Sequence, residues 1–424
     1  MSDTDTGVET APAPEGGPKG AARRGPGHYL GLNYLTFTGA MGLSALGDAA
    51  WYVALTWTLS REVSAAAAGS LLALSALPRL IALLGGGVLA DRTGPRRMMV
   101  LADLARCAVM VGAAGMLLLT RPSVTLLFVT AALVALISAF FIPASGAIKP
   151  LLLDEAHLLR GNALFVLGLR GGQAAGGPIG AAMISLGGLP LIALTNALGY
   201  AASAFASAKV KLVHEVPPPP ERKPFLRELT FGIRYLRGQR HLSLILVVIA
   251  LNELSCAPPV NLGLVLLSDR TGAGAAGAGY LLTAYTVGAV ASSFVTMLLP
   301  KAKRVGIALI VETALAAVCL AALGDVTALP AGLVLYLLLG LVTGLSGVIL
   351  VSLTQQWTGA EVRGRVMAVL SLVIFGAAPL ANAAYGVALD WLGFAPTLRV
   401  FAALCLAATA IVALTPTLRS ARLG

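Results

Sequence analysis

Twelve long apolar runs occupy most of this sequence, and each could cross a lipid bilayer, which takes roughly 17–25 residues. They lie near residues 31–58, 67–89, 98–119, 123–144, 162–186, 189–208, 242–267, 275–299, 305–323, 329–353, 366–389 and 394–416. Backbone groups in the bilayer core must satisfy their own hydrogen bonds, so each run predicts a helix. The alternating ten-residue pattern of a membrane barrel is absent from the sequence. The sequence therefore predicts an all-α membrane protein with twelve transmembrane helices.

The composition agrees with lipid as the main solvent. Hydrophobic residues make up 57% of the chain and charged residues 12%, whereas a soluble domain averages about 25% charged residues. All four cysteines, Cys107, Cys256, Cys319 and Cys405, lie inside apolar runs and form no CxxC pair. We therefore expect buried thiols, with neither a disulfide framework nor a metal site, and we expect no cofactor.

The basic residues predict the orientation. Most of the thirty Lys and Arg residues fall in the N-terminal tail, the C-terminal tail and every second loop, while the remaining loops hold only Arg61, Arg121 and Arg270. The positive-inside rule then places both termini in the cytosol, with the chain in the cell membrane. The net charge of +11 is spread over separate loops, so it indicates a membrane face rather than nucleic-acid binding.

The chain divides into two halves of six runs each. We predict a disordered cytosolic tail (1–29), a first bundle (30–208), a cytosolic linker (209–241), a second bundle (242–418) and a short cytosolic tail (419–424). The linker pattern predicts an amphipathic helix on the lipid surface, although a partner-binding helix is the alternative. Leu159–Ala163 resembles Val362–Val366, and weak repeats of this kind are typical of transporters.

The strongest local motif is Gly87–Arg97, between the second and third runs. Gly87 permits close helix packing, Gly94 turns the chain, and Asp91 can face the positive N-terminal end of another helix. The arginines of this segment can donate charge-assisted hydrogen bonds to carboxylates or carbonyls. The simpler alternative is an ordinary basic loop.

This segment resembles the loop signature of the major facilitator superfamily, and the resemblance extends over about residues 30–418. Pro143, Pro150, Gly177-Pro178 and Arg363–Arg365 look like the branch with macrolide-efflux proteins and siderophore exporters. The resemblance implies two pseudo-symmetric six-helix bundles that alternate in access. It also implies a cytosolic gate in which Asp91 faces the start of the eleventh helix. The gate residues would be Gly87, Asp91, Arg92, Gly94, Arg96, Arg97, Arg363 and Arg365.

Small residues mark the fifth run. Gly176, Gly177, Pro178 and Gly180 are similar to part of the antiporter motif of drug exporters. The alternative is a face for close helix packing with a proline kink. Pro258 and Pro259 in the seventh run also predict a kink or break.

Ionisable residues within spans are costly, which makes them candidates for function. Asp48 and Glu253 lie on helices that the resemblance places around the central cavity, with Arg79 and Arg170 as counter-charges. Asn33, Trp51 and Asn252 are candidates to line the same path, or they simply pack. For Asp103 with Arg106, three residues apart, and for Glu312, we expect structural roles.

The function predicted is export of a small amphipathic compound, such as a drug, antibiotic or secondary metabolite, driven by protons. The alternative is uptake or export of a polar metabolite or siderophore. A membrane enzyme ranks below both, because the sequence contains no convergent catalytic motif. A non-transporting receptor also ranks below both, because the loop signature is retained. The sequence contains no P-loop, so ATP is not a direct energy source. We expect a monomer, whose partners are its substrate, protons and lipid.

Overall fold

A computed structural model describes residues 27–154, 157–214, 225–298, 305–359 and 362–422. Within these ranges it describes all side chains except those at positions 80–81, 83–92, 159, 225–229, 296–298 and 364. Throughout the described ranges the regular structure is helical and no strand occurs.

Five helices of the described chain form the N-terminal half. They are α1 (Leu32–Glu62), α2 (Ala65–Thr93), α3 (Pro95–Leu119), α4 (Val124–Leu152) and α5 (Leu158–Lys209). The 52 residues of α5 cross the bundle twice, because Gly188 has a left-handed φ of 64° that breaks the helix. The chain therefore turns at Gly188, between the predicted fifth (162–186) and sixth (189–208) runs.

A short helix, α6 (Phe225–Gly238), leads into the C-terminal half. The remaining elements are α7 (Arg240–Pro258), η2 (Pro259–Gly263), α8 (Leu264–Arg270), α9 (Gly274–Leu298), α10 (Val305–Leu323), α11 (Leu329–Gln356), α12 (Arg363–Leu392), α13 (Phe394–Leu414) and α14 (Pro416–Arg419). The first three form one continuous crossing. The prolines that predict a break, Pro258 and Pro259, lie at a π-helical turn within it, where the Tyr336 hydroxyl donates to the Pro259 carbonyl over 2.6 Å.

Nine segments of the described chain are long and apolar enough to cross a membrane. One of them is α5 with its two crossings, and α1 and α2, of 31 and 29 residues, are long enough to cross as well. Together these make twelve crossings, six on each side of α6. The protein is an all-α, multi-pass membrane protein built from two six-helix bundles.

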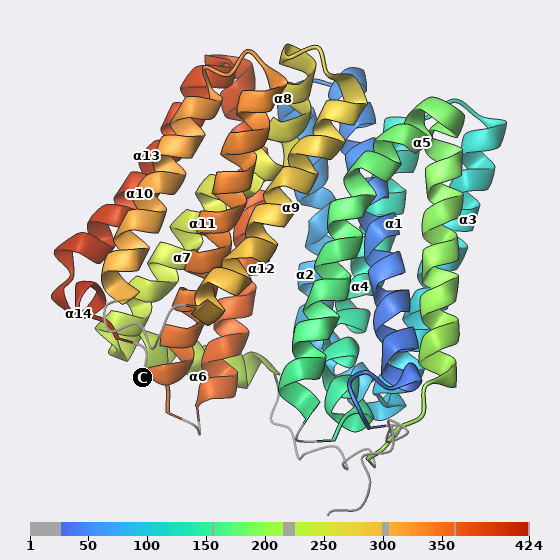
Figure 1. Cartoon of the computed structure of the whole chain (residues 1–424), viewed down its shortest axis with the longest axis horizontal. Coiled ribbons are helices and arrows are strands. Elements are labelled where there is room, and N and C mark those ends of the chain that lie inside the picture. Colours follow the sequence, from blue (N-terminus) through green and yellow to red (C-terminus); the bar gives the residue numbers. More distant parts are fainter. Residues whose placement is uncertain (1–26, 155–156, 215–224, 299–304, 360–361, 423–424) are drawn as a thin grey trace, which may run out of the picture.

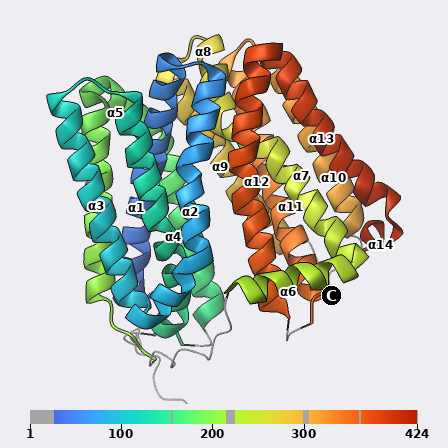
Figure 2. The same cartoon turned by 180° about the vertical axis from the view of Figure 1, so that it is seen from behind.

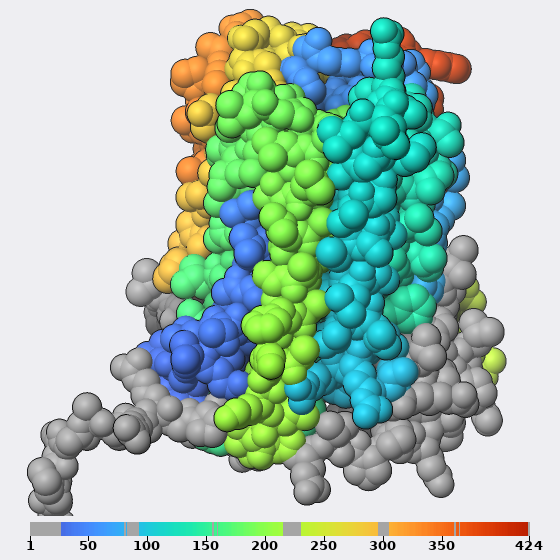
Figure 3. All heavy atoms as spheres, turned by 90° about the vertical axis from the view of Figure 1, so that its right-hand side faces the viewer, coloured from blue at the N-terminus to red at the C-terminus, as the bar shows by residue number. Residues whose placement is uncertain are grey.

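The two bundles lie side by side and are not parallel (Figures 1 and 2). We call the end that carries α6 the linker face, and the end with the α1–α2 and α12–α13 connections the opposite face. The bundles meet toward the opposite face and separate toward the linker face. On the flank of the N-terminal bundle, α3 and the second half of α5 cover the surface side by side (Figure 3).

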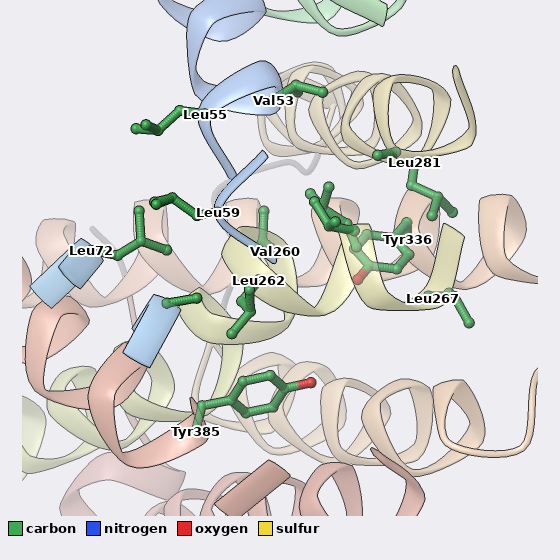
Figure 4. Close-up of a cluster of buried hydrophobic side chains, with 14 of the residues drawn as sticks. Val53, Leu55, Leu59, Leu72, Val260, Leu262, Leu267, Leu281, Tyr336 and Tyr385 are labelled. Carbon is green, nitrogen blue, oxygen red and sulfur yellow. The ribbon is translucent and has the colours of Figure 1, made fainter. Parts of the chain in front are cut away.

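The buried side chains follow this arrangement. One large apolar cluster contains residues of both bundles, and Figure 4 shows Val53, Leu55 and Leu59 of α1 near Val260 and Leu262 of η2. Two smaller clusters each belong to a single bundle. Among the described side chains, apolar burial therefore joins the bundles at one end, and contributes about 25 cal/mol for each Å² removed from solvent there.

Candidate functional site

A cavity of about 740 Å³ lies between the bundles. Its lining comes from α1, α2, α3, α4 and α5 of the first bundle and from η2 and α9 of the second. The lining residues of α4 and α5 lie toward the linker face, so the cavity occupies the side on which the bundles separate. Its volume is that of a typical small-molecule site, roughly 300–1,000 Å³.

Asp48 supplies the carboxylate of this cavity. It lies partly buried in the middle of α1, where it accepts a hydrogen bond from the hydroxyl of Tyr200 on α5. Asn196, one turn earlier on α5, is fully buried, and neither polar atom of its amide has a hydrogen-bond partner. Gly47 allows α1 to approach Asn196, because a Cβ at that position would lie 2.5 Å from its Oδ1. The carboxylate therefore lies beside hydroxyl and amide groups contributed by α5.

A second polar group lies next to this one. Asp103 of α3 accepts from Arg106 and from the Ser203 hydroxyl of α5, and its side chain is wholly buried. The Arg106 guanidinium lies over the rings of Phe141 and Tyr200, at 4.1 and 4.4 Å from their centroids. Arg106 also lines the cavity. The pair that the spacing predicts is therefore present, and its cation reaches the candidate site.

Three more cations among the described residues line the cavity. Arg79 of α2 lies 4.5 Å from the ring centroid of Phe375 on α12, in the other bundle, and its buried Nε has no hydrogen-bond partner. Lys149 of α4 lies 4.6 Å from the centroid of Phe165. Arg170 of α5 donates to the Gln173 amide oxygen at 3.2 Å. Within the described ranges, none of the three lies within ion-pair distance of a carboxylate.

The structure brings Asp48, Arg79 and Arg170 to one cavity and places the other sequence candidates elsewhere. Asn33 exchanges hydrogen bonds with the backbone of Lys211 at the linker face. Trp51 is buried in the apolar cluster between the bundles. Glu253 and Asn252 lie partly buried on α7, outside the described lining of the cavity.

Sequence reasoning missed several lining residues, chiefly Arg106 as a cavity residue, Lys149, Asn261 and Tyr285. Lys149 could have been predicted from the sequence, because Ser138, Ser145 and Lys149 follow each other at helical spacing on α4 and share a face. Asn261 carries no such signal, since it projects from the π-helical turn, where the helical register changes. Its amide donates to the Asn382 amide oxygen of α12 over 3.2 Å.

The predicted gate lies at the linker-face ends of α2, α3 and α12. Gly87, Asp91 and Arg92 lie on the last turns of α2, and their side-chain positions lie outside the described residues. Gly94 turns the chain with a φ of 77°, and Arg96 donates to the carbonyls of Ser207 and Ala208 at the end of α5. A cation at a helix C-terminus is favourable, so Arg96 stabilises its own bundle.

The remaining gate candidates lie near the start of α12. Arg363 donates to the Thr358 carbonyl at 3.4 Å, and the Arg365 guanidinium lies 4.4 Å from the Phe231 ring centroid of α6. Arg97 follows Arg96 on α3 and borders a separate surface hollow at the linker face.

The glycines of α5 lie at close helix contacts. A Cβ on Gly176 or Gly180 would meet α1, at the Leu46 carbonyl and at Ala50 respectively. A Cβ on Gly177 would lie 2.5 Å from the Gly279 carbonyl of α9, in the other bundle. One face of the motif therefore packs within the first bundle, and Gly177 packs between the bundles.

Polar contacts accompany the apolar cluster at the opposite face. Arg61 pairs with Asp269 of α8 at 2.8 Å, and both side chains are exposed. Asp390, at the end of α12, accepts from the backbone amide of Ala66 in the first turn of α2, at 3.1 Å. Among the described residues, no group of His, Cys, Asp and Glu is placed to hold a metal ion.

Several known proteins resemble this chain in sequence. The sequence model of the Major Facilitator Superfamily matches residues 37–260. The enterobactin exporter EntS of Escherichia coli O1:K1 is 25% identical over 288 residues, which cover 68% of each chain. EntS of Shigella boydii serotype 18 matches with the same identity and coverage.

Solved structures share the fold. The nucleoside transporter NupG superposes with a TM-score of 0.72 at 10% identity, covering 90% of this chain and 99% of that one. The D-xylose–proton symporter gives a TM-score of 0.69 at 14% identity, with 92% and 99% coverage. Since the sequence model spans more than half of the chain and the paired six-helix bundles agree with these structures, the protein belongs to the Major Facilitator Superfamily and is a membrane transporter rather than an enzyme.

Proposed function

We propose that this transporter exports a small amphipathic organic compound from the cell in exchange for protons, with Asp48 as the proton-carrying group. The observation that carries the proposal is the position of Asp48, a carboxylate in a cavity shared by both bundles. A carboxylate within the membrane is expensive unless it serves a function. Its hydrogen bond from Tyr200 supports this role, because protonation would change which groups the carboxyl binds.

Direction and orientation rest on two further observations. The basic loops favour a cytosolic linker face, so the cavity would lie on the cytosolic side of the closed apolar cluster. A compound could then enter from the cytosol and leave when the opposite face opens. The relatives named as enterobactin exporters also favour export.

The coupling requires that access and protonation change together. When the cavity faces the outside, the carboxyl of Asp48 takes up a proton, and when it faces the cytosol the proton leaves. Proton binding can shift the equilibrium between the outward-facing and the cytosol-facing states only if Asp48 has a different proton affinity in each state. Arg79 supplies that difference, because it lies against Phe375 of the other bundle. Its distance from Asp48 therefore changes as the bundles move, and with it the attraction that favours the ionised carboxyl.

The test uses a host strain from which its own exporters have been deleted. Cells with and without the transporter are loaded with a panel of amphipathic compounds that includes enterobactin, and the cell content is measured by mass spectrometry. At least one compound should be depleted in the expressing cells, and a protonophore should abolish the depletion. Accumulation instead of depletion would indicate uptake, which is the alternative function.

Two variants assign the proton carrier. Asp48→Asn should abolish gradient-driven depletion, while Glu253→Gln, a carboxyl of α7 outside the cavity lining, should retain it. Both proteins must reach the membrane in normal amounts, measured by immunoblot. Full activity of Asp48→Asn would remove Asp48 from the mechanism. Loss of gradient-driven depletion in Glu253→Gln alone would assign the proton-carrying role to Glu253 of α7.

A further inference from the structure

The charges of the cavity are unbalanced. Arg79, Lys149 and Arg170 line it without a carboxylate partner among the described residues, and Arg106 is already paired with Asp103. Asp48 is the single carboxylate among the described lining residues. Three unpaired cations therefore face one anion.

Such an excess within a membrane protein requires compensation. Unpaired cations in a span are unfavourable unless they face water or an anion. Lys149 and Arg79 also lie over aromatic rings, a contact that stabilises a cation only modestly. The remaining positive potential is therefore available to a bound molecule that carries negative charge.

On the basis of the proposed export function, we infer that the substrate is an organic anion with an aromatic or apolar body. Its acidic group, such as a carboxylate or an ionised phenol, binds Arg170 and Lys149, which can donate charge-assisted hydrogen bonds. Its body packs against Phe141 and Tyr285. A cationic drug is disfavoured by the same positive charges.

The inference is tested with two dyes of related skeleton and opposite charge. Carboxyfluorescein is an anion and tetramethylrhodamine methyl ester is a cation, and their binding to the purified transporter is followed by fluorescence anisotropy. The anion should bind more tightly. Arg170→Gln and Lys149→Gln should each weaken its binding about tenfold, the effect of losing one hydrogen bond to a charged group.

The matched control is Arg121→Gln. This exposed arginine of the α3–α4 connection has the same charge and lies outside the cavity lining, so binding should not change. Tighter binding of the cation, equal binding of both dyes or binding of neither overturns the charge assignment. None of these outcomes contradicts the proposed function, which is tested separately by depletion of the compounds from cells.

A second inference rests on a different observation, a repeated sequence pattern. Gly87–Gly94 reads GVLADRTG, and Gly386–Gly393 reads GVALDWLG, so the two share G-V-x-x-D-x-x-G. The first segment ends α2 and the second ends α12. The last glycine of each has a left-handed φ, 77° and 81° respectively, and lies between two consecutive helices.

At the opposite face the second segment makes a defined contact between the bundles. The Asp390 carboxylate accepts from the Ala66 amide in the first turn of α2, where the helix dipole favours negative charge. Gly386 packs so closely on the Ala65 carbonyl that a Cβ would overlap it, and Gly69 packs in the same way on the Asn382 carbonyl. The end of α12 is thus held against the beginning of α2.

We propose that Asp390 is a latch for the opposite face, built from an inverted copy of the Gly87–Gly94 segment. The latch holds that face closed in the conformation described here and releases when the face opens. It needs no ligand, because a carboxylate and a helix N-terminus are sufficient.

The test measures how often the opposite face opens. Leu59 of α1 is buried in the apolar cluster, so Leu59→Cys, in a background without the four native cysteines, reports opening through its rate of alkylation by a maleimide. In the purified protein Asp390→Asn should raise this rate about two- to fivefold, the effect of one carboxylate at a helix N-terminus. Asp390→Glu should restore slow labelling at least in part.

The control is Asp325→Asn. Asp325 is an exposed carboxylate that pairs with Arg399 within the C-terminal bundle, so its loss should leave the labelling rate unchanged. Equal rates in the Asp390→Asn and Asp325→Asn proteins would overturn the latch. A rise in both would do the same, because it would indicate general loosening rather than release at α2.

Discussion

At the residue scale, the contact between Asp48 and Tyr200 connects the cavity to the packing of the first bundle. Tyr200 is fully buried, and its ring also carries the Arg106 guanidinium. One side chain therefore contacts the carboxylate and the nearest paired cation. A change in the protonation of Asp48 would alter its hydrogen bond with Tyr200 of α5. Through Tyr200 it would also alter the contact with Arg106 of α3, without movement of the backbone of α1.

The substitution Tyr200→Phe tests this connection. It keeps the ring and removes the hydroxyl that donates to Asp48, so it should slow gradient-driven export severalfold or more. Its cost in folding free energy should be about 1 kcal/mol, the usual value for one hydrogen bond. Export in vesicles and the thermal midpoint in detergent measure the two effects.

Tyr34→Phe is the matched control. The Tyr34 residue is as buried as Tyr200, and its hydroxyl donates to the Gly161 carbonyl at 2.8 Å, but Tyr34 does not line the cavity among the described residues. Its loss should lower the thermal midpoint to a similar extent with little change in export. Equal loss of export in both variants would reduce Tyr200 to a packing residue.

At the scale of the elements, the helices were predictable and their rotations were not. Lipid requires every crossing to be helical, so the runs and the break at Gly188 could be inferred from composition and turn residues. Lipid and protein interior are both apolar, however, so the sequence pattern of a membrane helix only weakly indicates which face points inward. Asp48 and Glu253 look equivalent in sequence, yet only Asp48 lines the described cavity.

The contact between α5 and α9 gives a prediction at this scale. A methyl group added at Gly177 would overlap the Gly279 backbone of the other bundle, and overpacking of this kind costs about 1–3 kcal/mol. The cost applies only while the bundles are joined at the opposite face. Gly177→Ala should therefore raise maleimide labelling of Leu59→Cys about tenfold, since 1.4 kcal/mol changes an equilibrium by that factor.

Two other glycines of α5 separate this effect from general damage. Gly180→Ala would overlap Ala50 within the same bundle, so it should lower the thermal midpoint without faster labelling. Gly171→Ala meets nothing within 4 Å and should change neither. Faster labelling in all three variants would contradict a specific role for the α5–α9 contact.

At the scale of the whole molecule, the asymmetry of the contacts indicates the motion. Apolar burial, the Arg61–Asp269 pair and the Asp390 contact all join the bundles at one end, while the smaller apolar clusters stay within single bundles. Two bodies connected in this way can rock about the cavity with little loss of internal packing. A transport cycle then requires the contacts of the opposite face to break and reform each time.

Cross-linking that face should stop transport. In a background without native cysteines, Arg61→Cys with Asp269→Cys places two thiols on different bundles at the opposite face, where the native side chains lie 2.8 Å apart. A cleavable bismaleimide across this pair should abolish export, and cleavage should restore it, because the face can open only when the link is cut.

The matched pair is Asp325→Cys with Arg399→Cys, whose native side chains lie 2.9 Å apart within one bundle. Cross-linking it should leave export intact, since neither residue moves relative to the other as the bundles rock. Export that persists through a complete Arg61–Asp269 cross-link would show that the substrate leaves without separation of the bundles at this face.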